Sequence, residues 1–299
     1  MQRRFEGIIP PVTTPFSPDG DLQLDLLERN VERYLATELS GLLLLGSNGE
    51  AVHLSDQERL QMIRHVAPLV AGRKLFLVGL SAPTLREALA TTDALSDLPI
   101  DALLVSVPAY YRNRMTTAVL VDYFTQVAEN APFPVLLYNV PQYSGLEISP
   151  AVVGSLAPHP NIQGMKDSSG NLHYVQQVLA ATADVDFEVI MGSAQVLGPA
   201  LLLGIRAAIL AVACALPDLP IQLLRDYEAG RDIRQQQARL FQVANAVTSI
   251  YGVPGLKAAM NMNGFEGGSC RAPLADLSES EFSHLRELVG AYAEPLPSA

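Results

Sequence analysis

The sequence predicts an α/β protein built as a (β/α)8 barrel, the TIM-barrel fold, with a C-terminal helical extension. Two observations lead to this fold class. Eight short apolar runs alternate with helix-like stretches, and their spacing of roughly 20–35 residues is typical of strand–helix units in a parallel sheet. After residue 217 the alternation stops and only helix-like segments follow. The alternative is a doubly wound parallel sheet with a helical second domain.

The predicted strands are aliphatic runs that end in polar or glycine-containing turns. They are GIIPPVTTPF (7–16), GLLLLG (41–46), LFLVGLS (75–81), ALLVSVP (102–108), PVLLYNVP (134–141), IQGMKDS (162–168), FEVIMGS (187–193) and AAILAVACAL (207–216). The predicted organisation is a barrel over residues 1–217, with residues 218–299 forming C-terminal helices that complete and extend it.

Helices between these runs carry start signals. Ser55–Glu58 and Thr84–Glu87 have capping-box spacing, in which a hydroxyl and a carboxylate cap the first turn reciprocally. Ser149 precedes Pro150, and proline is suited to a first helical turn. In segment 24–35 the apolar residues recur at helical spacing, which predicts one face packed on the sheet. The helices predicted for the extension are 219–250 and 279–293.

Composition narrows the class of protein. The chain has 299 residues, 49% of them hydrophobic, so it can bury a large core. The net charge is −11 and basic residues gather only in Arg3–Arg4 and Arg112/Arg114, which argues against a nucleic-acid partner. The apolar stretch 201–216 contains a glycine and an arginine and is too short for a membrane span, and the N-terminus has no signal-peptide core. Two cysteines in different contexts predict reduced thiols and a cytoplasmic location.

In a (β/α)8 barrel the active site lies at the carboxyl ends of the strands. The residues at which the predicted strands become polar are therefore the candidates for the site. Most of these candidates bear hydroxyl groups, and one is a lysine. The full set is Thr13/Thr14, Ser47/Asn48, Ser81, Tyr110/Tyr111, Tyr138/Asn139, Lys166–Ser168 and Gly192/Ser193. The five histidines are scattered, and neither a glycine-rich dinucleotide motif nor a phosphate loop is present. We therefore expect a reaction without metal or cofactor.

Lys166 is the candidate nucleophile. Of the three lysines, it alone comes directly out of a predicted strand. The two-residue period of a strand places Ile162, Gly164 and Lys166 on one side, with room left by the glycine beneath the lysine. An apolar setting disfavours the ammonium form, so the neutral amine could attack a ketone and form an imine. The alternative is a structural lysine paired with Asp167 or another acid at a strand end.

Two neighbouring features could serve such a reaction. Tyr138, at the end of the preceding predicted strand, carries a phenol able to move protons during imine formation; the alternative is an aromatic cap on the core. The glycines of GSNGE (46–50) permit a tight turn whose N–H groups near Ser47 and Asn48 could hold a carboxylate. Alternatively, Ser47 and Glu50 form a capping box.

The loop PAYYRNR (108–114) places Tyr110 and Tyr111 after the fourth predicted strand, where barrel loops reach neighbouring elements. One tyrosine is expected to help the site while the other packs, unless both form an ordinary interface patch. Arg112 and Arg114 could attract an anionic substrate.

The motifs GSNGE, YYRNR, LLYNVPQYSG and GMKDSSG, in this order and spacing, resemble those of the dihydrodipicolinate synthase / N-acetylneuraminate lyase family. The resemblance covers essentially the whole chain, from residue 7 to the C-terminal helices. It implies a TIM-barrel enzyme that forms a lysine Schiff base with pyruvate or a pyruvate-like 2-keto acid. It also implies a homo-oligomer: a homotetramer, as a dimer of dimers, or a homodimer.

The resemblance also implies roles for single residues. Lys166 matches the Schiff-base lysine, and Tyr138 matches the tyrosine that relays protons. Ser47 stands where the family usually has the first of two threonines and keeps its hydroxyl, while Asn48 takes the second position. Together they match the turn that binds the substrate carboxylate.

Three further positions have expected roles, two of them from the same resemblance and the third from its place in the sequence. Tyr111 matches the tyrosine that reaches into the neighbouring subunit's site, although one extra residue before the pair leaves Tyr110 open. Gly192 matches a position near the bound keto acid. Ser168, two residues after the lysine, is expected to hydrogen-bond the departing half of the substrate.

The substrate is indicated by departures from the family pattern. The synthase branch has an arginine after YNVP that binds the aldehyde's carboxylate, and this chain offers Tyr143 there. GSNGE, KDSSG and GVPGLKAAM are most similar to 4-hydroxy-2-oxoglutarate aldolase, so we predict reversible cleavage of 4-hydroxy-2-oxoglutarate to pyruvate and glyoxylate. The alternatives are condensation of pyruvate with aspartate semialdehyde, a sugar-acid 2-keto aldolase or dehydratase, and a keto-acid sensor without turnover.

Overall fold

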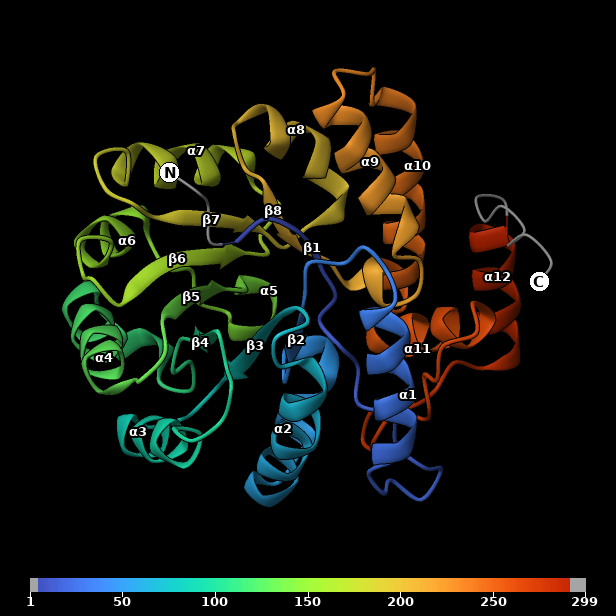
Figure 1. The fold of residues 1–299 in the computed structure, drawn as a ribbon, viewed down its shortest axis with the longest axis horizontal. Helices are drawn as coiled ribbons and strands as arrows, with labels where there is room; N and C mark the ends of the chain where they lie inside the picture. The colour runs from blue at the N-terminus through green and yellow to red at the C-terminus, as the bar shows by residue number, and fades with distance from the viewer. Residues whose placement is uncertain (1–4, 291–299) are drawn as a thin grey trace.

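The computed structural model describes residues 5–290, and Figure 1 shows its strands at the centre with helices around them. Eight parallel strands pair in the order β1-β8-β7-β6-β5-β4-β3-β2. A parallel bridge between Pro11 and Leu43 joins β1 to β2, where the Val12 N–H donates to the Leu43 carbonyl at 2.9 Å. The predicted (β/α)8 barrel is confirmed. The strands are β1 (Gly7–Ile9), β2 (Gly41–Leu44), β3 (Leu75–Leu80), β4 (Ala102–Ser106), β5 (Val135–Asn139), β6 (Ile162–Asp167), β7 (Glu188–Met191) and β8 (Ala207–Ile209).

Each of the eight predicted runs contains one strand, and every strand ends before its run does. The run 7–16 pairs only over Gly7–Ile9, because Pro10 and Pro11 lack the N–H groups that a ladder needs. The run 207–216 leaves the ladder after Ile209 and turns into the short helix η5 (Ala211–Cys214). The residues left over form the loops at the carboxyl ends of the strands.

The helices begin where the start signals predicted. Ser55 caps α2 with both hydrogen bonds of a capping box, and Thr84 caps α3 by accepting from the Glu87 N–H. Ser149 caps α6, which opens on Pro150. The helices of the barrel are α1 (Leu24–Leu35), α2 (Asp56–Val70), α3 (Leu85–Ala94), α4 (Thr117–Asn130), α5 (Pro141–Ser144), α6 (Pro150–Leu156), α7 (Leu172–Ala181), α8 (Leu197–Leu202) and α9 (Asp218–Glu228).

The C-terminal part of the chain follows as α10 (Arg234–Ala244), the π-helix η6 (Asn245–Ile250), α11 (Gly252–Met262) and α12 (Glu279–Gly290). Figure 1 shows α10, α11 and α12 together along one side of the barrel. The loop after α11 returns to α1, where Phe265 stacks on Tyr34 with ring centroids 4.9 Å apart. Residues 291–293 of the predicted last helix, like Arg3–Arg4, lie outside the described residues.

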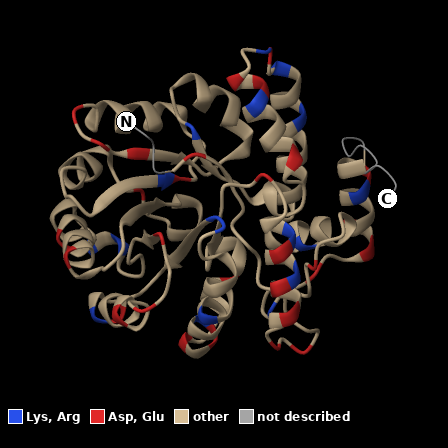
Figure 2. Ribbon diagram, in the orientation of Figure 1, with Lys and Arg blue, Asp and Glu red and all other residues tan. Residues whose placement is uncertain are grey.

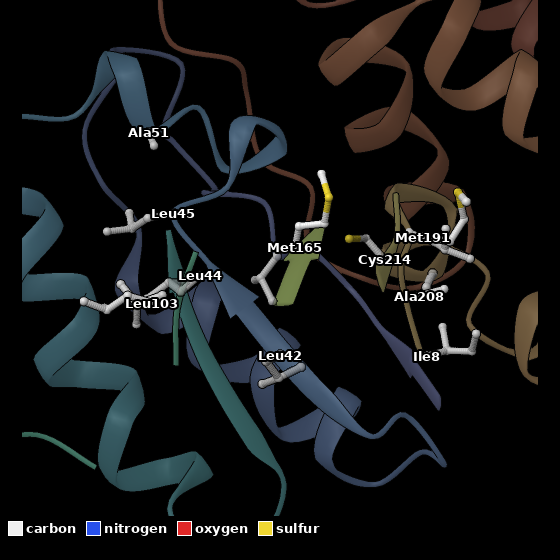
Figure 3. Packing of buried hydrophobic residues seen from close by; sticks show 14 of the residues in the cluster. Ile8, Leu42, Leu44, Leu45, Ala51, Leu103, Met165, Met191, Ala208 and Cys214 are labelled. Carbon is white, nitrogen blue, oxygen red and sulfur yellow. The ribbon is translucent and has the colours of Figure 1, made fainter. Parts of the chain in front are cut away.

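Two hydrophobic cores share the strands. The inner core fills the barrel with one side of each ladder, such as Leu43, Leu104 and Leu136. The outer core lies between strands and helices and takes the alternate positions; Figure 3 shows Leu42, Leu44, Leu103 and Met165 among its members. In Figure 2 the charged residues lie mostly on the surrounding helices. Within residues 5–290, no helix is both long and apolar enough to cross a membrane.

Strand β6 carries one irregularity that changes an expectation from the sequence. Val135 pairs with Ile162, but the next residue of β5, Leu136, pairs with Gly164, so Gln163 is an extra residue in the ladder. Ile162 consequently belongs to the outer core. The prediction that it shares a side with Lys166 was wrong, because the bulge reverses the alternation between them.

Candidate active site

Lys166 and Tyr138 lie side by side at the carboxyl ends of β6 and β5. They are register partners, and Lys166 also pairs with Ile190 of β7. Since Tyr138 and Ile190 belong to the inner core, Lys166 faces the interior of the barrel. Lys166 is 3% exposed and Tyr138 is 7% exposed. The lysine Nζ lies 4.7 Å from the centroid of the tyrosine ring.

Gly164 is required by a close approach of the neighbouring strand. A Cβ at this position would lie 2.3 Å from the Glu188 carbonyl oxygen of β7. Any side chain would therefore push β6 and β7 apart just before the lysine. This reason replaces the expectation that the glycine leaves room beneath Lys166.

The turn that follows β2 is connected to Tyr138. Ser47 opens the short helix η1 (Ser47–Gly49), and its Oγ lies 3.0 Å from the Tyr138 hydroxyl. Asn48 comes next in the turn and is partly buried. The structure thus joins three of the predicted site residues, Ser47, Tyr138 and Lys166, into one contiguous set.

The turn is held in an unusual backbone conformation. Leu45 before it and Glu50 after it have φ angles of 60° and 51°, which non-glycine residues rarely adopt. The Thr14 hydroxyl donates to the Gly49 carbonyl at 2.6 Å. The first N–H groups of such a helical turn have no acceptor within it, so they can receive an anion. The alternative capping box of Ser47 and Glu50 is wrong, because no side chain caps this turn.

Asp167 is directed away from Lys166. Its carboxylate accepts from Asn139 Nδ2 at 2.7 Å and from the Ser169 hydroxyl at 2.8 Å. Burial raises the pKa of Asp167, and the bonds from Asn139 and Ser169 oppose that rise. Within the described residues, no carboxylate lies within ion-pair distance of the Lys166 Nζ. The pairing of Lys166 with Asp167, the alternative to a nucleophilic role, is therefore absent.

Ser168 and Gly192 meet at the ends of β6 and β7. A Cβ on Gly192 would lie 2.2 Å from the Ser168 Oγ, and the Gly192 N–H donates to the Asp167 carbonyl at 2.6 Å. The predicted substrate-binding positions Ser168 and Gly192 are thus in contact with each other, one just after β6, which carries Lys166, and the other just after β7.

The tyrosine pair lies on the surface. Tyr110 and Tyr111 are 86% and 71% exposed and pack edge to face, with ring centroids 5.0 Å apart. The structure does not bring either ring to Lys166 within one chain. Arg112 reaches the end of α5, so close to Gly145 that a Cβ there would lie 2.1 Å from its Nη1. Tyr143 stands in α5, directly after β5, and is 64% exposed; partial desolvation and the phenol of Tyr138 raise its pKa.

Sequence reasoning missed Ser106. It is the register partner of Tyr138 on β4 and is in phase with Leu104 of the inner core. Its Oγ is buried and has no hydrogen-bond partner among the described residues. The available signal was a serine inside the aliphatic run ALLVSVP, which breaks the apolar pattern at an inward position.

A buried ion pair lies behind the turn and was also missed. Glu50 Oε1 and Lys257 Nζ are 2.5 Å apart, with side chains 1% and 2% exposed. Glu50 stands at the end of GSNGE, but nothing local in the sequence indicates that its partner is 207 residues later in the chain.

The two cysteines are free thiols, and they are not part of a metal site among the described residues. Cys214 and Cys270 are buried and free, as the sequence predicted. Burial raises the pKa of both thiols, that of Cys270 to about 12, so both stay protonated near neutral pH. Within residues 5–290, no three His, Cys, Asp or Glu side chains are grouped as metal ligands would be.

A parallel barrel with a buried lysine, a tyrosine and a hydroxyl-bearing turn at its mouth has the architecture of an enzyme that works by covalent catalysis. The model of the dihydrodipicolinate synthetase family matches residues 4–292, and the chain belongs to this family. It is an enzyme, a carbon–carbon lyase of the class that forms Schiff bases with pyruvate. Members of this family use small keto acids as substrates and are typically oligomeric.

Individual relatives agree over nearly the full length. The 4-hydroxy-tetrahydrodipicolinate synthase of Methanosphaerula palustris is 32% identical over 96% of this chain and 99% of its own. YagE of Escherichia coli K12, a prophage protein of the same family solved with pyruvate, is 28% identical with a TM-score of 0.90, covering 97% of this chain and 99% of its own. A variant of the Sulfolobus solfataricus 2-keto-3-deoxygluconate aldolase is 25% identical with a TM-score of 0.85, covering 95% of each chain.

Proposed function

We propose that Lys166 forms the Schiff base with C2 of a pyruvate-type 2-keto acid. One observation carries this proposal: the lysine is buried, without a carboxylate partner in the described chain, beside a tyrosine whose hydroxyl meets Ser47 at 3.0 Å. An amine in such a place has a proton-transfer group at hand and no competing ion pair.

The proposed reaction begins with the substrate carboxylate bound by the turn at Ser47 and Asn48. Lys166 Nζ attacks C2, and the Tyr138 hydroxyl, supported by Ser47, delivers the proton with which the carbinolamine oxygen leaves as water. The C3–C4 bond of the imine then breaks as the C4 hydroxyl loses its proton. The electron pair of that bond forms the enamine of pyruvate, which is protonated at C3 and hydrolysed from Lys166.

Three other residues have proposed roles in this site. Ser168 hydrogen-bonds the departing half of the substrate, and Gly192, which lies against Ser168, lines the keto-acid site beside it. Tyr111 completes the proton relay of a neighbouring subunit in a homotetramer or homodimer. Its exposure in one chain supports this role over one within its own barrel. We place the enzyme in the cytoplasm, supported by two free thiols.

For the substrate we propose 4-hydroxy-2-oxoglutarate, cleaved to pyruvate and glyoxylate. The support is Tyr143 of α5, which in the sequence YNVPQYSG stands where the synthase branch carries an arginine. The synthase name of the Methanosphaerula palustris relative supports the second candidate, condensation of pyruvate with aspartate semialdehyde. Arg112 lies against Gly145 in the loops that follow β4 and β5, and its guanidinium could meet a second carboxylate in either reaction.

Borohydride reduction in the presence of pyruvate tests the Schiff base. We expect one pyruvate-derived adduct, mapped by peptide mass to Lys166 and absent in Lys166→Ala. An adduct elsewhere, or none in the wild-type protein, would contradict the proposed chemistry.

Coupled assays separate the substrates. Glyoxylate release from 4-hydroxy-2-oxoglutarate is expected to exceed by at least about tenfold in kcat/KM any condensation of pyruvate with aspartate semialdehyde. The reverse preference would establish the synthase. A trapped adduct without turnover of either substrate, or of a sugar-acid 2-keto compound, would identify a keto-acid sensor.

A further inference from the structure

Glu50 ends the turn that carries Ser47 and Asn48, and its backbone is strained. Its φ and ψ are 51° and 34°, in the left-handed region, and it joins η1 to the next short helix, η2 (Ala51–His53). A non-glycine residue is strained in this conformation and persists there only where its surroundings enforce it. Contacts outside the turn must therefore hold Glu50 in place.

Those contacts come mainly from the C-terminal part of the chain. Glu50 Oε1 meets Lys257 of α11, while Oε2 accepts from the Arg271 backbone N–H at 3.0 Å. His53 Nδ1 lies 3.1 Å from the same Oε2. Lys257 also donates to the Ser269 carbonyl at 2.6 Å, so each end of the pair has further partners.

The pair is fixed between elements that are distant in sequence. The ring of Phe16, from the loop after β1, contacts two cations: Lys257 Nζ is 4.8 Å and Arg271 Cζ is 4.2 Å from its centroid. The Arg271 guanidinium in turn pairs with Glu58 of α2 at 2.6 Å. The position of Glu50 therefore depends on α2, α11 and two loops together.

Stability alone does not account for this arrangement. Removing two charges from water is unfavourable, and a buried pair can often be replaced by well-packed apolar residues without loss of stability. What the pair does fix is the place of the turn, since the Glu50 N–H donates to the Ser47 carbonyl at 3.1 Å. Moving Glu50 would move Ser47 away from Tyr138.

We propose that Glu50 and Lys257 are positioning residues: the buried pair sets the Ser47–Asn48 turn at the geometry that binds the keto-acid carboxylate. Through it, helix α11 of the C-terminal part becomes a support of the active site at the barrel mouth. This inference rests on the proposed Schiff-base function and names residues that do not touch the substrate.

The test combines Glu50→Gln with Lys257→Met, which removes both charges and nearly keeps the volumes. We expect the double variant to keep its Tm within about 5 °C of the wild type. The pyruvate concentration for half-maximal borohydride trapping should rise at least about tenfold, because a positioned, charge-assisted contact to the carboxylate is lost. Glu50→Asp keeps the charge but shortens the side chain, and should raise this concentration too.

Lys74→Met is the matched control. Lys74 binds the carbonyls of Thr37 and Leu39, so it too is a lysine that holds backbone oxygens, but it lies before β3 at the other end of the barrel. It should lower the Tm and leave the half-maximal pyruvate concentration unchanged.

The outcomes are distinguishable. If the wild-type protein forms no adduct, the proposed function fails. If it forms the adduct and both Glu50→Asp and the double variant trap pyruvate at the wild-type concentration, the pair is only structural and the inference is overturned. Should the double variant not fold, Glu50→Asp alone decides between these outcomes.

Discussion

Ser106 shows how much a single hydroxyl can indicate. Buried polar atoms are almost always hydrogen-bonded, and an unpaired one is unfavourable by about 1–3 kcal/mol. The Ser106 Oγ lacks a partner in the described chain although it sits beside Tyr138 in the ladder. A rotation about χ1 toward the mouth would let it bond to a substrate or to a water that takes part in the reaction.

We therefore predict that Ser106→Ala lowers kcat/KM by about tenfold without lowering the Tm, because no protein hydrogen bond is lost. Tyr123→Phe is the matched control. It removes another buried hydroxyl that has no partner within residues 5–290, on α4 and in the outer core. Steady-state kinetics and thermal unfolding of both variants check this. Equal kinetics for the two would assign Ser106 to packing alone.

Among single residues, those that mark the ends of strands could be predicted from the sequence. Lys166, Tyr138 and Ser47 stand where aliphatic runs become polar, and the barrel rule brings such positions together. It could not predict the partners of Glu50, because pairing across 207 residues depends on the finished fold. The phase of Ile162 was mispredicted because a bulge leaves no periodic signal in so short a strand.

The elements were predicted well where local chemistry decides them. Ser55, Thr84 and Ser149 cap their helices because a hydroxyl beside an unpaired N–H group favours that place in any context. The strand lengths were overestimated, because apolar residues after β1 and β8 continue into loops that are also buried. Apolar character alone does not show where a ladder ends.

The ion pair between Glu58, in the first turn of α2, and Arg271 is expected to affect the stability of the fold in acid. The Arg271 guanidinium, more than the bonds from Ser55, lowers the pKa of Glu58 from 4.5 to about 2, against the effect of burial. Since the folded-state pKa is the lower one, this carboxylate stabilises the fold above pH 4.5, and its contribution is lost as the pH falls to about 2.

We expect Glu58→Gln to have a smaller fall in Tm than the wild type between pH 4.5 and about 2, and a lower Tm at neutral pH. Glu32→Gln removes the exposed pair with Arg73 and should change the profile less, because water screens that pair. Thermal unfolding across this pH range is the measurement. Parallel profiles for the wild type and Glu58→Gln would contradict the assignment.

For the whole molecule, the exposed aromatic pair on the β4–α4 loop predicts shared active sites. Large aromatic side chains exposed together, as Tyr110 and Tyr111 are, favour burial against a partner. If Tyr111 acts in a neighbouring subunit, Lys166→Ala and Tyr111→Ala should complement each other. Subunits mixed after partial unfolding and refolding would then recover activity that neither variant has alone.

The control mixture is Lys166→Ala with Tyr138→Phe. These residues face each other within one barrel, so every mixed site still lacks one of them and activity should stay low. Recovery in the control, or none in the test mixture while light scattering shows mixed oligomers, would remove Tyr111 from the shared site.

The use of lysine in this fold also has a practical consequence. None of the three lysine side chains is free in solvent: Lys166 and Lys257 are buried, and the Lys74 ammonium donates to two carbonyls. The positive charge on the outer helices is carried by arginine, which does not react with amine-directed reagents. Acylating dyes, aldehyde fixatives and amine-coupled sensor chips should therefore find few side-chain attachment points on the native protein. Arginine chemistry or an added tag is the better route for labelling or immobilising it, since both thiols are buried as well. A mass shift at Lys166 would stand out because few other side chains would be modified.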